Sequence, residues 1–125
     1  MHAGSCLCGA VRFTIAASLR PADACHCTAC RKQSGHYWAS TDVLRGDLSI
    51  DDPEALLTWY ASSEKVRRGF CARCGASLLW DALAKPTIAV AMGALDGPTE
   101  SRLGLHIFVA EKGDYYELAD GVPQN

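Results

Sequence analysis

The 125-residue chain has no long apolar run and no excess of charge of one sign. A membrane-spanning helix needs roughly 20 consecutive apolar residues, and no stretch approaches that length, so we expect no membrane partner. The 12 basic and 14 acidic residues leave a formal net charge of -2. This charge creates no global field that would attract nucleic acid or an acidic membrane surface. We therefore expect no nucleic-acid partner either, and partners must be inferred from local groups of residues.

The start of the chain also lacks targeting signals. The segment 1–6 has neither the basic region nor the apolar region of a secretory signal peptide. We therefore expect a cytoplasmic protein, whose cysteines are kept as thiols. There is no repeat and no Ser/Gly linker, and 49% hydrophobic residues suffice for one modest core. These features predict a single domain over residues 1–125.

Short apolar runs predict most of the secondary structure. Val11, Phe13 and Ile15 alternate with polar residues, which is the period of a half-buried strand. Similar runs predict strands at residues 37–43, 48–50, 56–60, 66–70, 76–80, 88–92 and 105–110. The one helical signal is 28–34, where Thr28 can cap the first turn and Gly35 can end the helix. We therefore predict a mainly β fold with one short helix.

Seven cysteines are many for so short a chain, and they form three groups. The groups are Cys6-Leu7-Cys8-Gly9, Cys25-His26-Cys27-Thr28-Ala29-Cys30 and Cys71-Ala72-Arg73-Cys74-Gly75. The two residues between Cys71 and Cys74 allow both sulfurs to face one ion at the zinc–sulfur distance of roughly 2.3 Å. In a reducing compartment such groups indicate a metal rather than a disulfide framework.

The odd cysteine count suggests one closed and one open zinc site. A closed tetrahedral site needs four thiolates, whereas three thiolates leave a coordination position for a substrate. The four-cysteine set consists of Cys6, Cys8, Cys71 and Cys74. The remaining trio consists of Cys25, Cys27 and Cys30.

Two other divisions of the ligands remain open from the sequence. Cys6 and Cys8 could pair with the central trio, or His26 could be the fourth ligand of a closed second site. In an extended segment His26 would point away from the metal of its two neighbours, which favours a supporting role. His106 lies in an apolar strand pattern, which is typical of a partly buried, hydrogen-bonded histidine.

These motifs resemble those of the glutathione-dependent formaldehyde-activating enzyme and centromere protein V family. The resemblance lies in residues 5–11, 25–35 and 68–78, and also in 106–109 and 120–124. It implies an Mss4-like fold of small twisted antiparallel sheets with one short helix, stapled by zinc. It also implies two zinc ions per chain, a structural ion on the four-cysteine set and a second ion on the trio, near the substrate.

The activity that this resemblance implies is that of a carbon–sulfur lyase. Such an enzyme forms and cleaves S-hydroxymethylglutathione, or a similar adduct of a thiol with formaldehyde or a related small aldehyde. The catalytic centre would be the open zinc site of Cys25, Cys27 and Cys30, with glutathione as co-substrate. Zinc would hold the thiol as a thiolate next to the carbonyl carbon.

The sequence is less specific about the other groups of this site. Thr28, Ser34, His36 and a water molecule are all candidates to give a proton to the new alkoxide. Arg31 and Arg68 flank the cysteine groups and are our candidates for binding the carboxylates of glutathione, because a guanidinium fork fits a carboxylate.

The alternative to an enzyme is a non-catalytic, zinc-stabilised module that binds a protein or a thiol. A closed second site, with His26 or another side chain as fourth ligand, would favour the module. An exchangeable fourth ligand would favour the enzyme. A redox sensor whose trio oxidises and releases zinc is a third hypothesis. The oligomeric state stays open.

Overall fold

The structure, a computed structural model, describes residues 1–125. Its strands are β1 (His2–Ser5), β2 (Arg12–Ile15), β3 (Ala22–Cys25), β4 (Trp38–Leu44), β5 (Leu48–Asp51), β6 (Leu57–Ala61), β7 (Val66–Cys71), β8 (Ser77–Ala82), β9 (Thr87–Ala91) and β10 (Leu103–Ile107). The one α-helix is α1 (Thr28–Ser34), and three 3-10 helices are η1 (Arg45–Asp47), η2 (Met92–Ala94) and η3 (Val109–Glu111). The predicted mainly β fold with one short helix is confirmed. None of the helices has the length and hydropathy needed to cross a bilayer.

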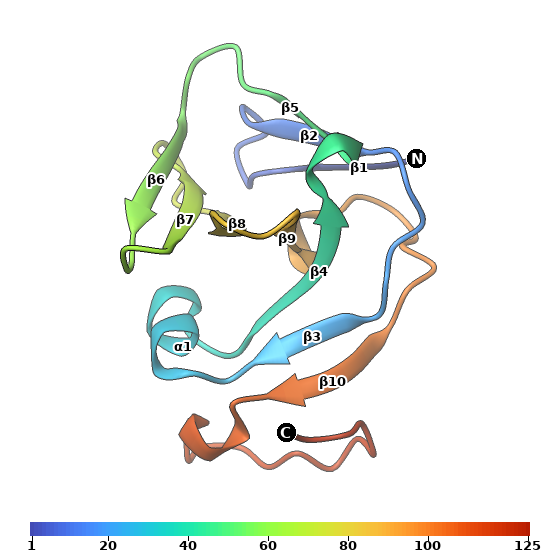
Figure 1. Cartoon of the computed structure of the whole chain (residues 1–125), viewed down its shortest axis with the longest axis vertical. Coiled ribbons are helices and arrows are strands. Elements are labelled where there is room, and N and C mark those ends of the chain that lie inside the picture. Colours follow the sequence, from blue (N-terminus) through green and yellow to red (C-terminus); the bar gives the residue numbers. More distant parts are fainter.

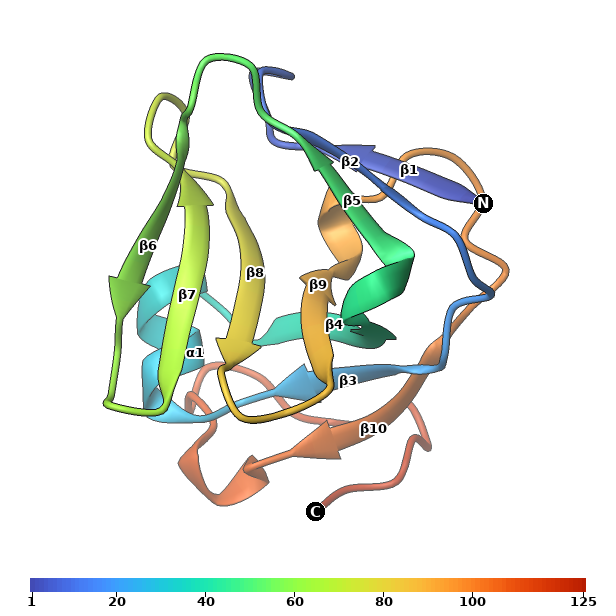
Figure 2. The same cartoon turned by 45° about the horizontal axis from the view of Figure 1, so that its top comes forward.

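The strands form two sheets (Figures 1 and 2). The small sheet has the order β1-β2-β5 and the large sheet the order β10-β3-β4-β9-β8-β7-β6. All strand pairs are antiparallel except β10 with β3, which is parallel. β10 lies along β3 at one edge, next to the C-terminal segment (Figure 1). The expectation of antiparallel sheets is therefore met by all pairs but this last one.

Most of the predicted strands are present, within one or two residues, but β1 and β3 were missed. β1 has no apolar alternation, and it includes Gly4, where a Cβ atom would lie 2.3 Å from a ring carbon of Phe13. The prediction of a strand over 105–110 is wrong after Ile107. Phe108 takes a left-handed conformation with φ of 55°, and the 3-10 helix η3 follows it.

Side-chain alternation gives the large sheet two different faces. Along β9, Ile88 and Val90 join the main core with Phe13 and Ile15 of the small sheet. Ala89 and Ala91 point to the other face, where they pack in a second cluster with Cys30 and Trp38. Because successive side chains of a strand point to opposite sides, one face packs against the small sheet and the other meets α1. The second face carries the cysteine trio.

A buried carboxylate links strands β7 and β8 with the 3-10 helix η1. Asp81 on β8 is fully buried, and it accepts hydrogen bonds from Arg45 Nη2 at 2.6 Å and Arg67 Nε at 2.8 Å. Burial by itself raises the pKa of Asp81, but the hydrogen bonds from the two arginines outweigh it and the pKa lies below the ordinary 3.8. The Arg67 guanidinium also stacks on Trp59 at 3.8 Å from the ring centre.

We predict that Asp81→Asn lowers the free energy of unfolding at pH 7 by about 3 kcal/mol, since it leaves two guanidinium groups without their anion. Because the carboxylate has a depressed pKa in the folded state, its contribution is present above the pKa of the unfolded state and is lost as the pH falls below about 4. Urea titrations between pH 7 and pH 3 should show the gap between wild type and variant narrowing with acid. A constant gap would contradict the role of the charge.

Candidate functional site

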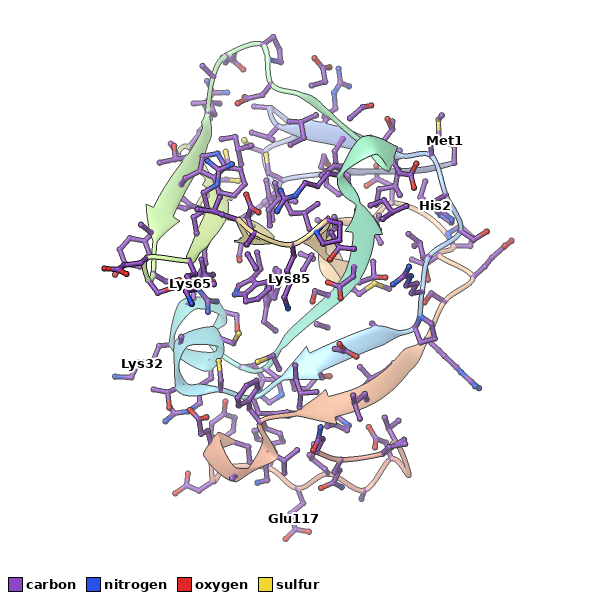
Figure 3. All side chains as sticks on the ribbon, in the orientation of Figure 1. Met1, His2, Lys32, Lys65, Lys85 and Glu117 are labelled. Atoms are coloured by element: carbon purple, nitrogen blue, oxygen red, sulfur yellow. The ribbon has the colours of Figure 1, made fainter.

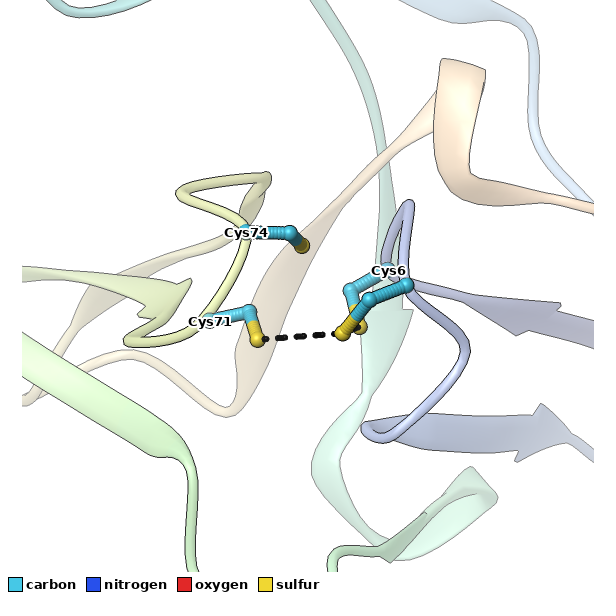
Figure 4. A group of neighbouring side chains, drawn as sticks. Cys6, Cys71 and Cys74 are labelled. Atoms are coloured by element: carbon cyan, nitrogen blue, oxygen red, sulfur yellow. Dashed lines mark hydrogen bonds between the residues drawn. The ribbon is translucent and has the colours of Figure 1, made fainter.

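The four-cysteine set brings together two segments far apart in sequence. Cys6 and Cys8 lie in the turn between β1 and β2, whereas Cys71 ends β7 and Cys74 lies in the turn that follows it. All four sulfurs lie within 4.8 Å of one another. The Sγ–Sγ distance is 3.6 Å for Cys6 and Cys8 and 3.9 Å for Cys8 and Cys71. Figure 4 shows Cys6, Cys71 and Cys74 with their sulfurs turned toward one another.

Both turns of this set end on a glycine with positive φ. Gly9 has φ of 80° and Gly75 has φ of 77°, values that L residues with a Cβ atom adopt rarely. The amide of Gly9 donates to the carbonyl of Cys6 at 3.1 Å, and that of Gly75 donates to the carbonyl of Cys71 at 2.8 Å. In each turn the glycine amide therefore bonds back to the first cysteine of the pair, across three residues for Gly9 and across four for Gly75.

Backbone amides favour negative charge on this set. Burial raises the pKa of Cys74, but hydrogen bonds from the amides of Ala76 and Cys8 outweigh it and lower this pKa to about 6. For Cys6, burial again opposes ionisation and the Val11 amide, at 3.3 Å from Sγ, lowers the pKa below its ordinary value. For Cys8, the amide of Ala10 lowers the pKa, but burial and the hydrogen bonds of its cysteine neighbours outweigh this amide and raise the pKa to about 11. Four converging sulfurs form a donor set that suits zinc, which prefers tetrahedral thiolate coordination.

The trio is assembled where β3 passes into α1. Cys25 ends β3, Cys27 precedes the helix and Cys30 lies in its first turn. Their three sulfurs lie within 4.8 Å of one another. The helix cap predicted at Thr28 is wrong. Cys27 is the N-cap residue and its Sγ accepts from the amide of Cys30 at 3.3 Å.

The N-cap moves to Cys27 because Thr28 has another partner. Its amide and its hydroxyl each donate to Glu111 Oε1 at 3.0 Å. The end of the helix agrees with the prediction: Gly35 has φ of 90° and its amide donates to the carbonyl of Arg31 at 2.9 Å. The metal-ligand candidate Cys27 is thereby also a structural part of the helix start.

A buried arginine supports negative charge on Cys30. Arg68 on β7 is only 6% exposed, and its Nη1 lies 3.5 Å from Cys30 Sγ and 3.1 Å from Gln33 Oε1. A hydrogen bond from Cys25 and the nearby guanidinium of Arg68 outweigh burial and lower the pKa of Cys30 to about 5. The same pairing with Cys30, together with burial, raises the pKa of Cys25. The first negative charge of the trio therefore resides on Cys30.

The two arginines predicted to bind substrate differ in their surroundings. Arg68 lines the cavity next to the trio. Arg31 does not line it, and its Nε donates to the carbonyl of Glu111 at 3.1 Å. None of the predicted proton donors Thr28, Ser34 and His36 lines this cavity either.

The trio opens into a cavity of about 390 Å³. This size lies within the range of about 300–1,000 Å³ that is usual for small-molecule sites. Its lining comprises Asp23, Cys25, Cys27, Cys30, Trp38, Ser40, Asp42, Arg68, Trp80, Lys85, Ala89, Ile107 and Phe108. A larger cleft of about 720 Å³ lies next to Cys6 and Trp38, but no cysteine of the trio lines it. Lys85 in the trio's cavity has no recognisable sequence signal, because only the arrangement of the sheet brings it there.

His26 points away from the trio into a buried chain of hydrogen bonds. Its Nε2 lies 2.9 Å from Nδ1 of His106, whose Nε2 lies 2.8 Å from Oδ2 of Asp120. Its Nδ1 bonds to the hydroxyl of Tyr116. Both ring nitrogens of His26 are thus engaged, and neither is free to bind a metal. The expected supporting role of His26 and the buried, hydrogen-bonded state of His106 agree with these contacts.

The direction of this chain follows from its carboxylate end. Asp120 can only accept, so His106 donates from Nε2, and with both rings neutral its Nδ1 accepts from His26 Nε2. Nδ1 of His26 then accepts from the Tyr116 hydroxyl. Burial, followed by the charge of His106, lowers the pKa of His26 and so favours this neutral form. The chain ties the C-terminal segment to the loop between Cys25 and Cys27.

Comparisons with known proteins agree with this picture. The profile of the family described as "Glutathione-dependent formaldehyde-activating enzyme" matches residues 1–111. A protein of Halomonas elongata provisionally named a glutathione-dependent formaldehyde-activating enzyme is 30% identical, over 92% of this chain and 79% of its own length. The crystal structure of a Rhodobacter sphaeroides protein is similar in fold, with a TM-score of 0.62 and 23% identity over 81% of this chain and 98% of the other.

We predict that His106→Leu lowers the free energy of unfolding by about 1–3 kcal/mol, because it leaves the Nε2–H of His26 buried without an acceptor. His2→Leu is the matched control: this side chain has no hydrogen-bond partner, and its replacement should cost less than about 0.5 kcal/mol. Urea unfolding of the two variants provides the measurement. Equal stability of the two variants would show that the histidine chain does not hold this part of the fold.

Proposed function

The chain belongs to the glutathione-dependent formaldehyde-activating enzyme family, and on that basis we propose that it is a carbon–sulfur lyase which joins glutathione to formaldehyde, or a related small aldehyde, and reverses the reaction. The observation that carries this proposal is the trio of sulfurs at the mouth of a 390 Å³ cavity, with no fourth side-chain ligand. We take residues 1–125 as one catalytic domain.

Two zinc ions per chain form part of the proposal. The four-cysteine set would hold a structural ion, and Cys25, Cys27 and Cys30 would hold the second. A zinc ion on three thiolates supplies an open coordination position where a thiol is bound in its ionised form. The sulfur-only donor sets and the distances within each cluster suit this metal.

The residues around the trio have separate tasks in the proposed reaction. Arg68 compensates the negative charge of Cys30 and favours the thiolate form of this cysteine. Trp38 and Trp80 give the cavity apolar walls that limit the access of water. The position of Cys25 and Cys27 is held by the hydrogen bonds of His26 behind them.

The bond changes balance without a redox partner. The sulfur of glutathione attacks the carbonyl carbon, a carbon–sulfur bond forms and the π electron pair of the carbonyl moves to its oxygen. That oxygen takes up a proton, which replaces the one lost from the thiol. Since Thr28, Ser34 and His36 do not line the cavity, we assign the proton transfer to water.

The alternative, a binding module with a closed second site, is less well supported. His26 was the candidate for the fourth ligand, and both of its ring nitrogens are occupied by other partners. The rate at which formaldehyde exchanges with glutathione, measured by NMR in the presence of the zinc-loaded protein, distinguishes an enzyme from a module. An enzyme accelerates this exchange beyond the uncatalysed rate.

We predict that Cys27→Ala lowers the zinc content from about two ions per chain to about one and abolishes the acceleration of exchange. The variant should still unfold cooperatively, because the four-cysteine set is intact. Elemental analysis, NMR exchange and thermal unfolding provide the three readouts. A folded variant that accelerates the exchange as much as the wild type would contradict the proposed site.

We predict that Arg68→Gln slows turnover by about tenfold or more, since the nearest cation to Cys30 is lost and its pKa rises. Arg12→Gln is the control: Arg12 is well exposed and its 3.8 Å pair with Asp51 is at the surface. Turnover that responds equally to both substitutions would contradict the role assigned to Arg68.

A further inference from the structure

The cavity next to the trio contains charges of both signs that have no partner. Asp23, Asp42 and Lys85 all line it. Five ion pairs occur in the chain, and none of them includes these residues. Their side chains make no protein hydrogen bond either. Asp23 is half-buried, and Asp42 and Lys85 are exposed, so all three are accessible to a ligand. A cavity of this kind is complementary to a ligand that itself carries both charges.

The register of the large sheet explains how these charges are arranged. Asp23 and Cys25 are two residues apart on β3 and therefore point to the same face. Asp23 is opposite Ser40 on β4, and Asp42 follows two residues further along the same face. The two acids thus lie on adjacent strands, on the side of the cavity that continues from the trio.

Lys85 lines the same cavity from the turn between β8 and β9. Asp42 is opposite Ala89 on β9, and Ala89 is opposite Trp80 on β8. The ammonium group of Lys85 lies 5.6 Å from the Trp80 ring centre. The small side chain of Ala89 leaves the space between the acid and the base open. In Figure 3 Lys85 lies between the ribbon of β8 and β9 and that of α1 and β3, and its side chain is exposed.

We propose that this cavity binds the amino-acid end of the substrate thiol, with Asp23 and Asp42 receiving its ammonium group and Lys85 its carboxylate. The inference rests on the proposed function, because it extends the site of the same trio. An α-amino-acid group carries both charges on one carbon, so it satisfies both sides of the cavity together. The occupant is then the γ-glutamyl end of glutathione, since the glycine end offers a carboxylate alone.

Distance along the sheet adds a further condition on the substrate. Asp23 and Cys25 are two positions apart on β3, which corresponds to about 7 Å along the strand. In free cysteine the ammonium group is only three bonds from the sulfur, too near to reach the acids while the sulfur is at the trio. The cavity therefore selects thiols whose amino-acid group is set off by a longer chain.

The test uses three thiols and the zinc-loaded full chain in calorimetric titrations. The first is glutathione, the second is glutaryl-cysteinylglycine, which lacks only the ammonium group, and the third is 2-mercaptoethanol. We expect the second to bind about tenfold more weakly than the first, or weaker still, because it loses a charge-assisted contact. Asp42→Asn should weaken the binding of glutathione by a similar factor and leave the affinities of the other two thiols unchanged. Such a dependence of one change on the other is the coupling that a double-mutant cycle detects.

Matched controls separate this effect from a general loss of charge. Lys85→Met should weaken the binding of both peptides and leave that of 2-mercaptoethanol unchanged. Lys65 and Asp114 are exposed and lie outside the cavity, so Lys65→Met and Asp114→Asn should change none of the three affinities. Equal affinity for glutathione and its deaminated analogue would overturn this inference and leave the proposed function standing. Failure of all three thiols to bind would overturn both.

Discussion

The alternation of side chains across the large sheet is the constraint on which the rest of the structure depends. One face of β4 and β9 carries Val43, Ile88 and Val90 into the core that the small sheet covers. The opposite face carries small residues and tryptophan, and it forms the floor of the cavity beside the trio. A shift of one residue in the register would exchange these faces. Packing and candidate chemistry are therefore two consequences of one strand register.

Buried charge in this chain is compensated. Asp81 is held by two arginines, Arg68 is held by Cys30 and Gln33, and the buried histidine chain ends on the carboxylate of the exposed Asp120. Uncompensated charge in a protein interior is costly, so these pairs account for how polar groups persist in so small a fold. The acids and the lysine of the cavity are in a different position, because Asp23 is half-buried and Asp42 and Lys85 are exposed. They lie together beside the trio without partners of their own, which leaves them available to a charged ligand.

Two kinds of sequence signal were informative here. Turn-bounded apolar runs predicted β2 and β4 to β9, and the spacing of cysteines predicted two groups of sulfurs that the structure brings together. These sequence signals gave no prediction, or a wrong one, where the conformation of a segment depends on contacts with other segments. β3 has no periodicity of its own and forms because β10 and β4 flank it. Thr28 satisfies every local rule for a helix cap, yet Glu111, distant in sequence, takes its hydroxyl and leaves the cap to Cys27.

The sequence by itself determined the fold class, the seven sulfur donors and the likeness to a family, because periodicity and ligand spacing are local properties of a chain. Tertiary structure decided among the divisions of the cysteines that the sequence left open, gave His26 its hydrogen-bond partners, and brought Arg68 rather than Arg31 to the cavity. It alone placed Asp42 and Lys85 on the lining of one cavity. These outcomes depend on strand order and register, which are set by contacts between segments that lie tens of residues apart.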